Sequence, residues 1–172
     1  DKLFGMAGTD TASYSGSSAA VTVNLTSGTG SGGDAAGDTL SLIENVTGSA
    51  NADTLTGDTK ANTLSGGAGD DTLTGGAGND TLTGGDGTDT ASYSTASGGI
   101  GVMLETGVAW GSDAAGDTLS SIENVTGSGY VDNISGSSDA NVIDGGAGDD
   151  NIWAFSGNDT LTGGAGADKL FG

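Results

Sequence analysis

The sequence between Gly48 and Ser92 repeats with a period of nine residues and reads GSANADTLT, GDTKANTLS, GGAGDDTLT, GGAGNDTLT and GGDGTDTAS. Every unit has glycine first, aspartate or asparagine sixth, and an apolar residue eighth between threonine or serine residues. The three units from Gly66 fit the pattern GGxGxDxUx, in which U is a large apolar residue, although the third has Ala91 there. Glycine tolerates the positive φ of tight turns, and threonine favours strands. The period therefore predicts a solenoid in which tight turns and short strands alternate.

A strand of about three residues is too short to be stable alone and must pair with the strand one coil above it. We expect two nine-residue units to form one coil, so that equivalent residues two units apart stack with a spacing of about 4.8 Å. The expected fold class is all-β. The core columns predicted in this way are Leu55 on Leu73, Leu64 on Leu82, Ile134 on Ile152 and Leu170, and Ile143 on Leu161.

A second copy of the same pattern follows at a constant offset, which relates Asp10 to Asp89 and Glu44 to Glu123. Each copy consists of a connector and five nine-residue units. In the first connector Val21 and Val23 alternate with polar residues and predict a strand, whereas the stretch 27–38 is rich in turn residues. We read TLSLIENVT, from Thr39, as a degenerate unit in which Glu44 is sixth. The predicted division is residues 1–13 as the end of a preceding array, module 14–92 (connector 14–47, array 48–92) and module 93–171 (connector 93–126, array 127–171).

The composition excludes several functions. The formal net charge is −20, the only basic side chains are Lys2, Lys60 and Lys169, and the chain has no His, Cys or Pro. Nucleic acid is therefore an unsuitable partner. No apolar run approaches the roughly 18 residues of a membrane span, and no arrangement of His, Cys, Ser or Lys indicates catalysis. Such a charge is typical of disordered chains, but here the acids recur at fixed positions.

The two-unit coil brings the sixth residues of alternate units together in rows. Two carboxylates about 5 Å apart repel each other by roughly 1 kcal/mol even in water. The small core of each unit does not offset that repulsion, so a bound cation is expected. Oxygen ligands from carboxylates and turn carbonyls suit Ca²⁺, and the absence of His and Cys argues against zinc. The predicted rows are Asp53, Asp71 and Asp89; Asn62 and Asp80; Asp132, Asp150 and Asp168; and Asn141 and Asp159.

The units resemble the calcium-binding nonapeptide repeats of the repeat-in-toxin (RTX) family. The resemblance implies a parallel β-roll that holds several Ca²⁺ ions between the turns of alternate units, through the sixth-position side chains and turn carbonyls. The strongest implied pairs are Asp71 with Asp89, Asp53 with Asp71, and Asp150 with Asp168, whereas units with asparagine imply weaker sites. Beyond these rows and Asp10, the implied metal-site residues are the turn glycines Gly66, Gly67, Gly69, Gly75, Gly76, Gly78, Gly84, Gly85, Gly87, Gly145, Gly146, Gly148, Gly163, Gly164 and Gly166.

Some features have competing interpretations. Each sixth-position aspartate could be an ordinary solvated turn residue. The acids of the two DAAGD segments, Asp34, Asp38, Asp113 and Asp117, could form an additional metal site, but we expect them to lie in solvated loops. Trp153 and Phe171 lie two units apart at outward positions, so they predict a stacked apolar stripe. That stripe either contacts another copy or module, or covers the end of the core.

We expect a calcium-binding structural module of an extracellular or cell-surface bacterial protein, such as an adhesin, a surface-layer protein or a filament. The resemblance also implies type I secretion as an unfolded chain. The alternative is a non-catalytic accessory module of a secreted enzyme, such as an alginate epimerase or a metalloprotease. The sequence DKLFG occurs at both ends of the chain; it indicates either one unit of a longer tandem protein or chance recurrence within a degenerate motif.

Overall fold

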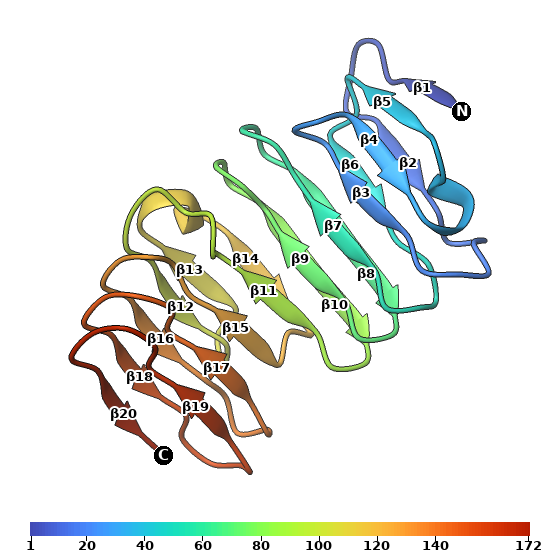
Figure 1. Cartoon of the computed structure of the whole chain (residues 1–172). Helices are drawn as coiled ribbons and strands as arrows, with labels where there is room; N and C mark the ends of the chain where they lie inside the picture. The colour runs from blue at the N-terminus through green and yellow to red at the C-terminus, as the bar shows by residue number, and fades with distance from the viewer.

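The computed structural model describes residues 1–172 as two ten-stranded sheets that face each other along an elongated roll (Figure 1). The first sheet contains, in spatial order, β1 (Lys2–Phe4), β5 (Thr39–Ser41), β4 (Thr29–Ser31), β3 (Thr22–Asn24), β7 (Thr54–Thr56), β9 (Thr72–Thr74), β11 (Thr90–Ser92), β15 (Asn124–Thr126), β17 (Val142–Asp144) and β19 (Thr160–Thr162). The second contains β2 (Thr11–Ser13), β6 (Asn45–Thr47), β8 (Thr63–Ala68), β10 (Thr81–Asp86), β14 (Thr118–Ser120), β13 (Val108–Trp110), β12 (Gly101–Met103), β16 (Asn133–Ser135), β18 (Asn151–Trp153) and β20 (Lys169–Phe171). Two 3₁₀ helices, η1 (Gly33–Ala35) and η2 (Ser112–Ala114), complete the fold, and neither is long or apolar enough to cross a membrane.

The arrays form a parallel β-roll, which confirms the predicted fold class. Successive units alternate between the two sheets, so each strand pairs with the strand two units away. Leu55 is paired with Leu73, and Leu64 with Leu82, as the period predicts. The predicted columns of the second array are confirmed as well: Ile134 with Ile152 and Leu170, and Ile143 with Leu161.

The core is one continuous layer of small and branched residues between the two sheets, to which each sheet contributes a column. It includes Leu55, Leu73 and Ile134, whose side chains are fully buried, and one cluster of 25 buried residues runs through both arrays and both connectors. Burying a leucine or isoleucine stabilises the fold by about 1.5–3 kcal/mol. The roll therefore depends on one such residue per unit, and much of its backbone lies in turns at the edges.

Each connector inserts an antiparallel hairpin into the otherwise parallel sheet. The predicted strand at Val21 and Val23 is confirmed as β3, which runs parallel to β7. The stretch 27–38, which the sequence marks as rich in turn residues, also contains strand β4, and β4 pairs antiparallel with both β3 and β5. The second connector repeats this arrangement with β12, β13 and β14.

The sequence suggested that TLSLIENVT is one nine-residue unit, but the structure does not show it as one. Thr39–Ser41 and Asn45–Thr47 form separate strands, β5 and β6, in opposite sheets. Only Leu42, Ile43 and Glu44 join them, so this turn is shorter than the turn of a regular unit. The predicted place of Val46 is nevertheless correct, since it pairs with Leu64 two units further along the chain.

The two hairpins occupy opposite sheets. Strands β3 and β4 belong to the first sheet, whereas their counterparts in the second module, β12 and β13, belong to the second (Figure 1). The reason is that the chain passes between the sheets an odd number of times per module. Both sheets continue through the two modules without interruption, so the modules are successive segments of one roll.

Candidate metal centre

The sixth-position side chains form two ladders, one along each edge of the roll. One carboxylate oxygen of Asp71 accepts a hydrogen bond from the backbone N–H of Asp53 at 2.7 Å, and Asp89 accepts one from Asp71 at 2.8 Å. At the other edge Asp80 accepts from the N–H of Asn62 at 2.8 Å. The second array has the same contacts, from Asp132 to Asp150, from Asp150 to Asp168 and from Asn141 to Asp159. The predicted rows are therefore present in both arrays.

The second carboxylate oxygen has no protein partner in several of these residues. The Oδ2 atoms of Asp71, Asp80, Asp89 and Asp150 are buried without any hydrogen bond, and each of these residues is at most 1% exposed. All four belong to units with the sequence GGxGxD. The Oδ2 atom of Asp10, in the unit GMAGTD, is buried without a partner as well. A buried carboxylate oxygen that lacks a donor is strongly destabilising unless a cation or proton compensates it.

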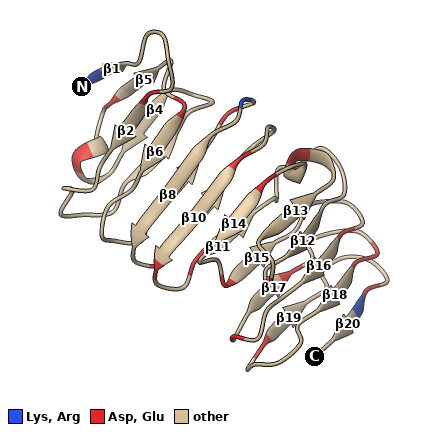
Figure 2. Cartoon of the chain, turned by 180° about the vertical axis from the view of Figure 1, so that it is seen from behind, with Lys and Arg blue, Asp and Glu red and all other residues tan.

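The pKa values of these carboxyl groups reflect that environment. Burial, together with the neighbouring charges of Asp53 and Asp89, raises the pKa of Asp71 to about 6, although the hydrogen bond from the Asp53 N–H lowers it. Burial likewise raises the pKa of Asp80, Asp89 and Asp150. Most acidic residues lie in the turns of the roll (Figure 2). The chain has only three lysines, so the positive charge that would balance these carboxylates must come from outside the chain.

The glycines of each turn leave space around these oxygens. A Cβ atom on Gly66 would lie 2.0 Å from Asp71 Oδ2, and one on Gly75 would lie 2.4 Å from Asp80 Oδ2. At Gly85, where φ is +122°, a Cβ would lie 1.9 Å from the carbonyl oxygen of Gly67, one coil earlier. The turns thus stack bare carbonyl groups and carboxylates without intervening side chains. Gly66, Gly67, Gly84 and Gly85 lie in the last residues of β8 and β10, and the other predicted glycines lie in the turns.

The first turn of each array differs, because a serine satisfies its aspartate. The backbone N–H of Ser49 donates to Asp53 Oδ2, and its hydroxyl donates to Asp53 Oδ1 at 2.9 Å. Ser128 makes the same two contacts with Asp132, at 2.6 Å and 2.8 Å. Both carboxylates are thus paired by the protein itself, which makes Asp53 and Asp132 weaker metal candidates than the sequence suggested. In the sequence, this difference is marked by the serine at the second position of the GSxxxD turn.

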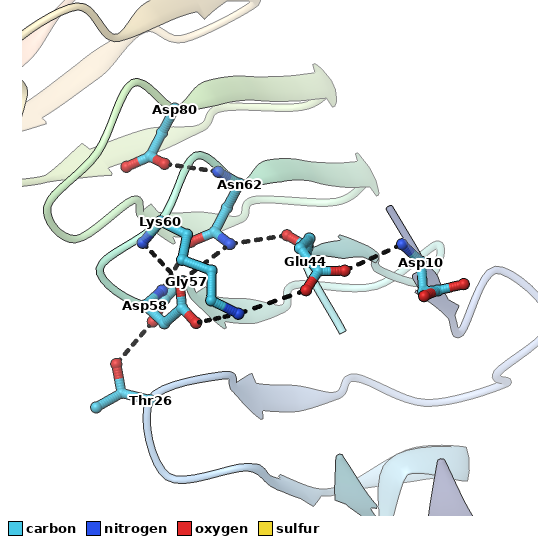
Figure 3. A network of polar contacts seen from close by, with 8 residues as sticks. All are labelled: Asp10, Thr26, Glu44, Gly57, Asp58, Lys60, Asn62 and Asp80. Atoms are coloured by element: carbon cyan, nitrogen blue, oxygen red, sulfur yellow. Dashed lines mark hydrogen bonds and ion pairs between the residues drawn. The ribbon is translucent and has the colours of Figure 1, made fainter. Parts of the chain in front are cut away.

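The sixth residue of the second turn of each array is an uncharged asparagine, whose side chain is also satisfied internally. Asn62 accepts a hydrogen bond from the Asp58 N–H at 2.7 Å and donates through Nδ2 to the Glu44 carbonyl at 2.8 Å (Figure 3). Asn141 donates to the Glu123 carbonyl in the same way, at 2.7 Å. These two positions therefore need no cation, and the demand for one is concentrated in the GGxGxD units.

The prediction that the DAAGD acids are all solvated is wrong for Asp38 and Asp117, which are 5% and 1% exposed. Asp117 accepts hydrogen bonds from the Asp80 N–H at 2.8 Å and from the Tyr93 hydroxyl at 3.1 Å. Asp38 accepts one from the Tyr14 hydroxyl at 2.9 Å. Burial raises the pKa of Asp117 to about 6, and burial also raises the pKa of Tyr93. The recurrence of TASYS at the same distance before each buried acid is the only sequence trace of this pairing.

The remaining sixth-position acids of the second array, Asp159 and Asp168, are half-buried and accept the hydrogen bonds described above. No group of three or more acidic side chains is close enough to hold a metal ion by itself. A cation in these turns would therefore need backbone carbonyl groups in addition to one or two carboxylates. Calcium accepts six to eight such oxygen ligands at flexible distances, so the donor set fits Ca²⁺.

A two-sheet roll of nine-residue units, with buried carboxylates and bare carbonyls stacked in its turns, is the architecture of a calcium-binding repeat module. A family comparison places the chain in the same class. The RTX calcium-binding nonapeptide repeat matches four times, over residues 47–82, 56–91, 126–154 and 156–172, and thereby covers more than half of the sequence. The chain belongs to this family. A search of curated proteins finds no match.

Proposed function

We propose that the chain is a structural module whose arrays are completed by several Ca²⁺ ions in the GGxGxD turns. The observation that carries this proposal is the set of buried, unpartnered Oδ2 atoms of Asp71, Asp80, Asp89 and Asp150. Within the module, the turn glycines contribute carbonyl oxygens, and the carboxylates contribute charge. The ions would convert the most destabilising groups of the fold into its strongest contacts between coils.

The test is a calcium titration of the whole chain followed by far-ultraviolet circular dichroism, with magnesium as the control cation. We expect β structure to appear as calcium rises, to disappear when EGTA removes it, and to respond weakly to magnesium, which requires stricter octahedral geometry. A β signal that is the same in EGTA and in millimolar calcium would contradict the proposal.

We further propose that the module belongs to an extracellular or cell-surface bacterial protein of the adhesin, surface-layer or filament type. Three properties support this: the tandem repetition of the whole module, the excess of acidic residues, and a family whose repeats are generally structural. An acidic chain that folds only when calcium is plentiful suits secretion in the unfolded state. The accessory module of a secreted enzyme remains the second candidate, and the sequence of the whole gene distinguishes the two. We retain the division into modules 14–92 and 93–171 as part of this proposal.

We also propose that the aromatic stripe of Trp153 and Phe171 contacts a further copy or a neighbouring module. The two rings stack with centroids 5.7 Å apart and an angle of 9° between their planes, and Phe171 is 49% exposed. Replacing Trp153 with threonine should weaken self-association in calcium, because it removes the larger ring of the stripe. The control is Val142→Thr, which removes an exposed apolar side chain from the opposite sheet. Sedimentation velocity measures the effect, and equal self-association of both variants and the parent would exclude the contact.

A further inference from the structure

The turn that ends the second connector is unusually short. Ser121, Ile122 and Glu123 alone join β14 to β15, whereas the whole stretch 75–80 joins β9 to β10 in the array. Ser121 has a φ of +50°, and Ile122 is buried. The first connector has the same turn at Leu42, whose φ is +55°. Because both copies of this turn have a residue other than glycine with a left-handed backbone conformation, we infer that the turn is held in one conformation.

This conformation places the Ser121 carbonyl where a regular turn places a glycine carbonyl. The position that a Cβ on Gly84 would fill lies 2.0 Å from Ser121 O and 2.4 Å from Asp89 Oδ2. In the regular array, the same position at Gly48 lies 2.4 Å from the carbonyl oxygen of Gly66 and 2.4 Å from Asp53 Oδ2. Ser121 therefore provides the carbonyl of the next coil, although it lies outside the repeats.

Glu123 replaces the sixth-position aspartate in this short turn. Its Oε2 atom accepts a hydrogen bond from the Asp89 N–H at 2.8 Å, just as Asp89 accepts one from Asp71 at 2.8 Å. The additional methylene of glutamate lets the carboxylate reach this position from a turn with fewer residues. Asp89 itself is fully buried, and its Oδ2 atom has no partner. A carboxylate oxygen, a carbonyl oxygen and a second carboxylate thus meet at the junction of array and connector.

We propose that this junction is a further divalent-cation site, formed by the Asp89 carboxylate, the Ser121 carbonyl and the Glu123 carboxylate. It takes Ca²⁺, because all its donors are hard oxygen atoms of mixed type. The inference rests on the proposed function, which assigns calcium to the repeats themselves. It extends the calcium sites beyond the nine-residue units, so that the connector continues the row of ions instead of interrupting it.

The turn at the first connector has a similar arrangement, which differs from this site in one respect. There Asp10, the Leu42 carbonyl and Glu44 take the corresponding places, and Asp10 Oδ2 is again buried without a partner. However, the Lys60 ammonium lies 3.4 Å from Glu44 Oε1 and partly neutralises it (Figure 3). The residue that corresponds to Lys60 in the second module is Asp139, so Glu123 has no corresponding lysine. The site at the second connector is therefore expected to bind calcium more tightly than its counterpart at the first connector.

Two variants test the site in the whole chain: Glu123→Gln removes its charge, and Asp139→Lys installs the lysine of the first module at an exposed position. Isothermal titration with Ca²⁺ gives the number of bound ions and their affinities, and Glu44→Gln is the matched control. We expect both test variants to lose one ion or to bind it at least about tenfold more weakly, while the circular dichroism spectrum in saturating calcium is retained. The control should change calcium binding much less.

The outcomes separate this inference from the proposed function. If the parent chain binds no calcium, the proposed function fails. If the parent binds calcium and both test variants bind the same number of ions with the same affinities, only the junction site is overturned. If Glu123→Gln does not fold, the exposed Asp139→Lys variant is the test: the loss or weakening of one ion supports the junction site, and unchanged calcium binding overturns it.

Discussion

Replacing Asp71 with asparagine will have opposite effects on stability with and without calcium. In EGTA the variant should be more stable than the parent, because it removes a buried carboxylate charge that no protein group compensates. The gain should be on the order of 1 kcal/mol. The asparagine oxygen still accepts the hydrogen bond from the Asp53 N–H, so the ladder between the coils is kept.

In calcium the same substitution should destabilise the chain. An ion that binds only the folded state stabilises it in proportion to the logarithm of its affinity, so each tenfold loss of affinity costs about 1.4 kcal/mol. The loss of a charged ligand weakens calcium binding in oxygen sites. Urea unfolding of the parent and the variant, each in EGTA and in millimolar calcium, measures both signs in one experiment.

Asp53→Asn is the matched control for this reversal. Both oxygens of Asp53 already accept hydrogen bonds from protein donors, including the N–H and hydroxyl of Ser49. An amide nitrogen in place of one oxygen would face a donor, which costs about 1–3 kcal/mol whether calcium is present or not. We therefore expect a loss of stability in both conditions. A change of the same sign for Asp71→Asn in both conditions would show that its carboxylate is not compensated by a cation.

The sequence predicted the arrays well because a strict period determines register. Once two nine-residue units form a coil, the pairing of Leu55 with Leu73 and the row of Asp53, Asp71 and Asp89 follow, and both are found. What the period does not show is which oxygens remain without donors. That depends on whether the second residue of the turn is a serine, such as Ser49, or a glycine.

The connectors were predicted less well because their structure depends on distant partners. Strand β4 has no apolar alternation, and its buried residue is Gly30, where a Cβ would lie 2.8 Å from the carbonyl oxygen of Ala35. This segment is a strand because it pairs with β3 and β5, whereas its own residues do not indicate a strand. The burial of Asp117 depends in the same way on the hydroxyl of Tyr93, which lies in a different part of the connector. Neither relation has a periodic signature.

Replacing Gly85 with alanine should destabilise the roll strongly, with calcium and without it. The Cβ would lie 1.9 Å from the carbonyl oxygen of Gly67, and no side-chain rotation relieves a clash between backbone and Cβ. Gly8→Ala is the matched control, because Gly8 has a φ of +129° and no atom within 4 Å of the added Cβ. The control isolates the cost of the backbone conformation, about 1–3 kcal/mol. Gly85→Ala should cost roughly 1–3 kcal/mol more, as thermal melts in calcium and in EGTA can measure.

The contact that these two variants probe also explains why the opening turns of each array depart from GGxG. Gly67 and Gly76 closely approach the carbonyl groups of Ser49 and Asp58, which lie one coil earlier. Ser49 and Asp58 themselves occupy the same position in the two turns that follow the connector, and the coil before them has no regular turn to approach. The second glycine is therefore required where a turn closely approaches the carbonyl group of the turn one coil earlier. Met6 and Phe155 occupy this position with φ values of 70° and 71°. An alanine at position 85 can relax toward that geometry only by moving away from the Gly67 carbonyl, which should move the oxygen atoms of the two turns apart. Equal stabilities of Gly85→Ala and Gly8→Ala in both conditions would show that the positive φ alone, and not the contact between coils, selects glycine in these repeats.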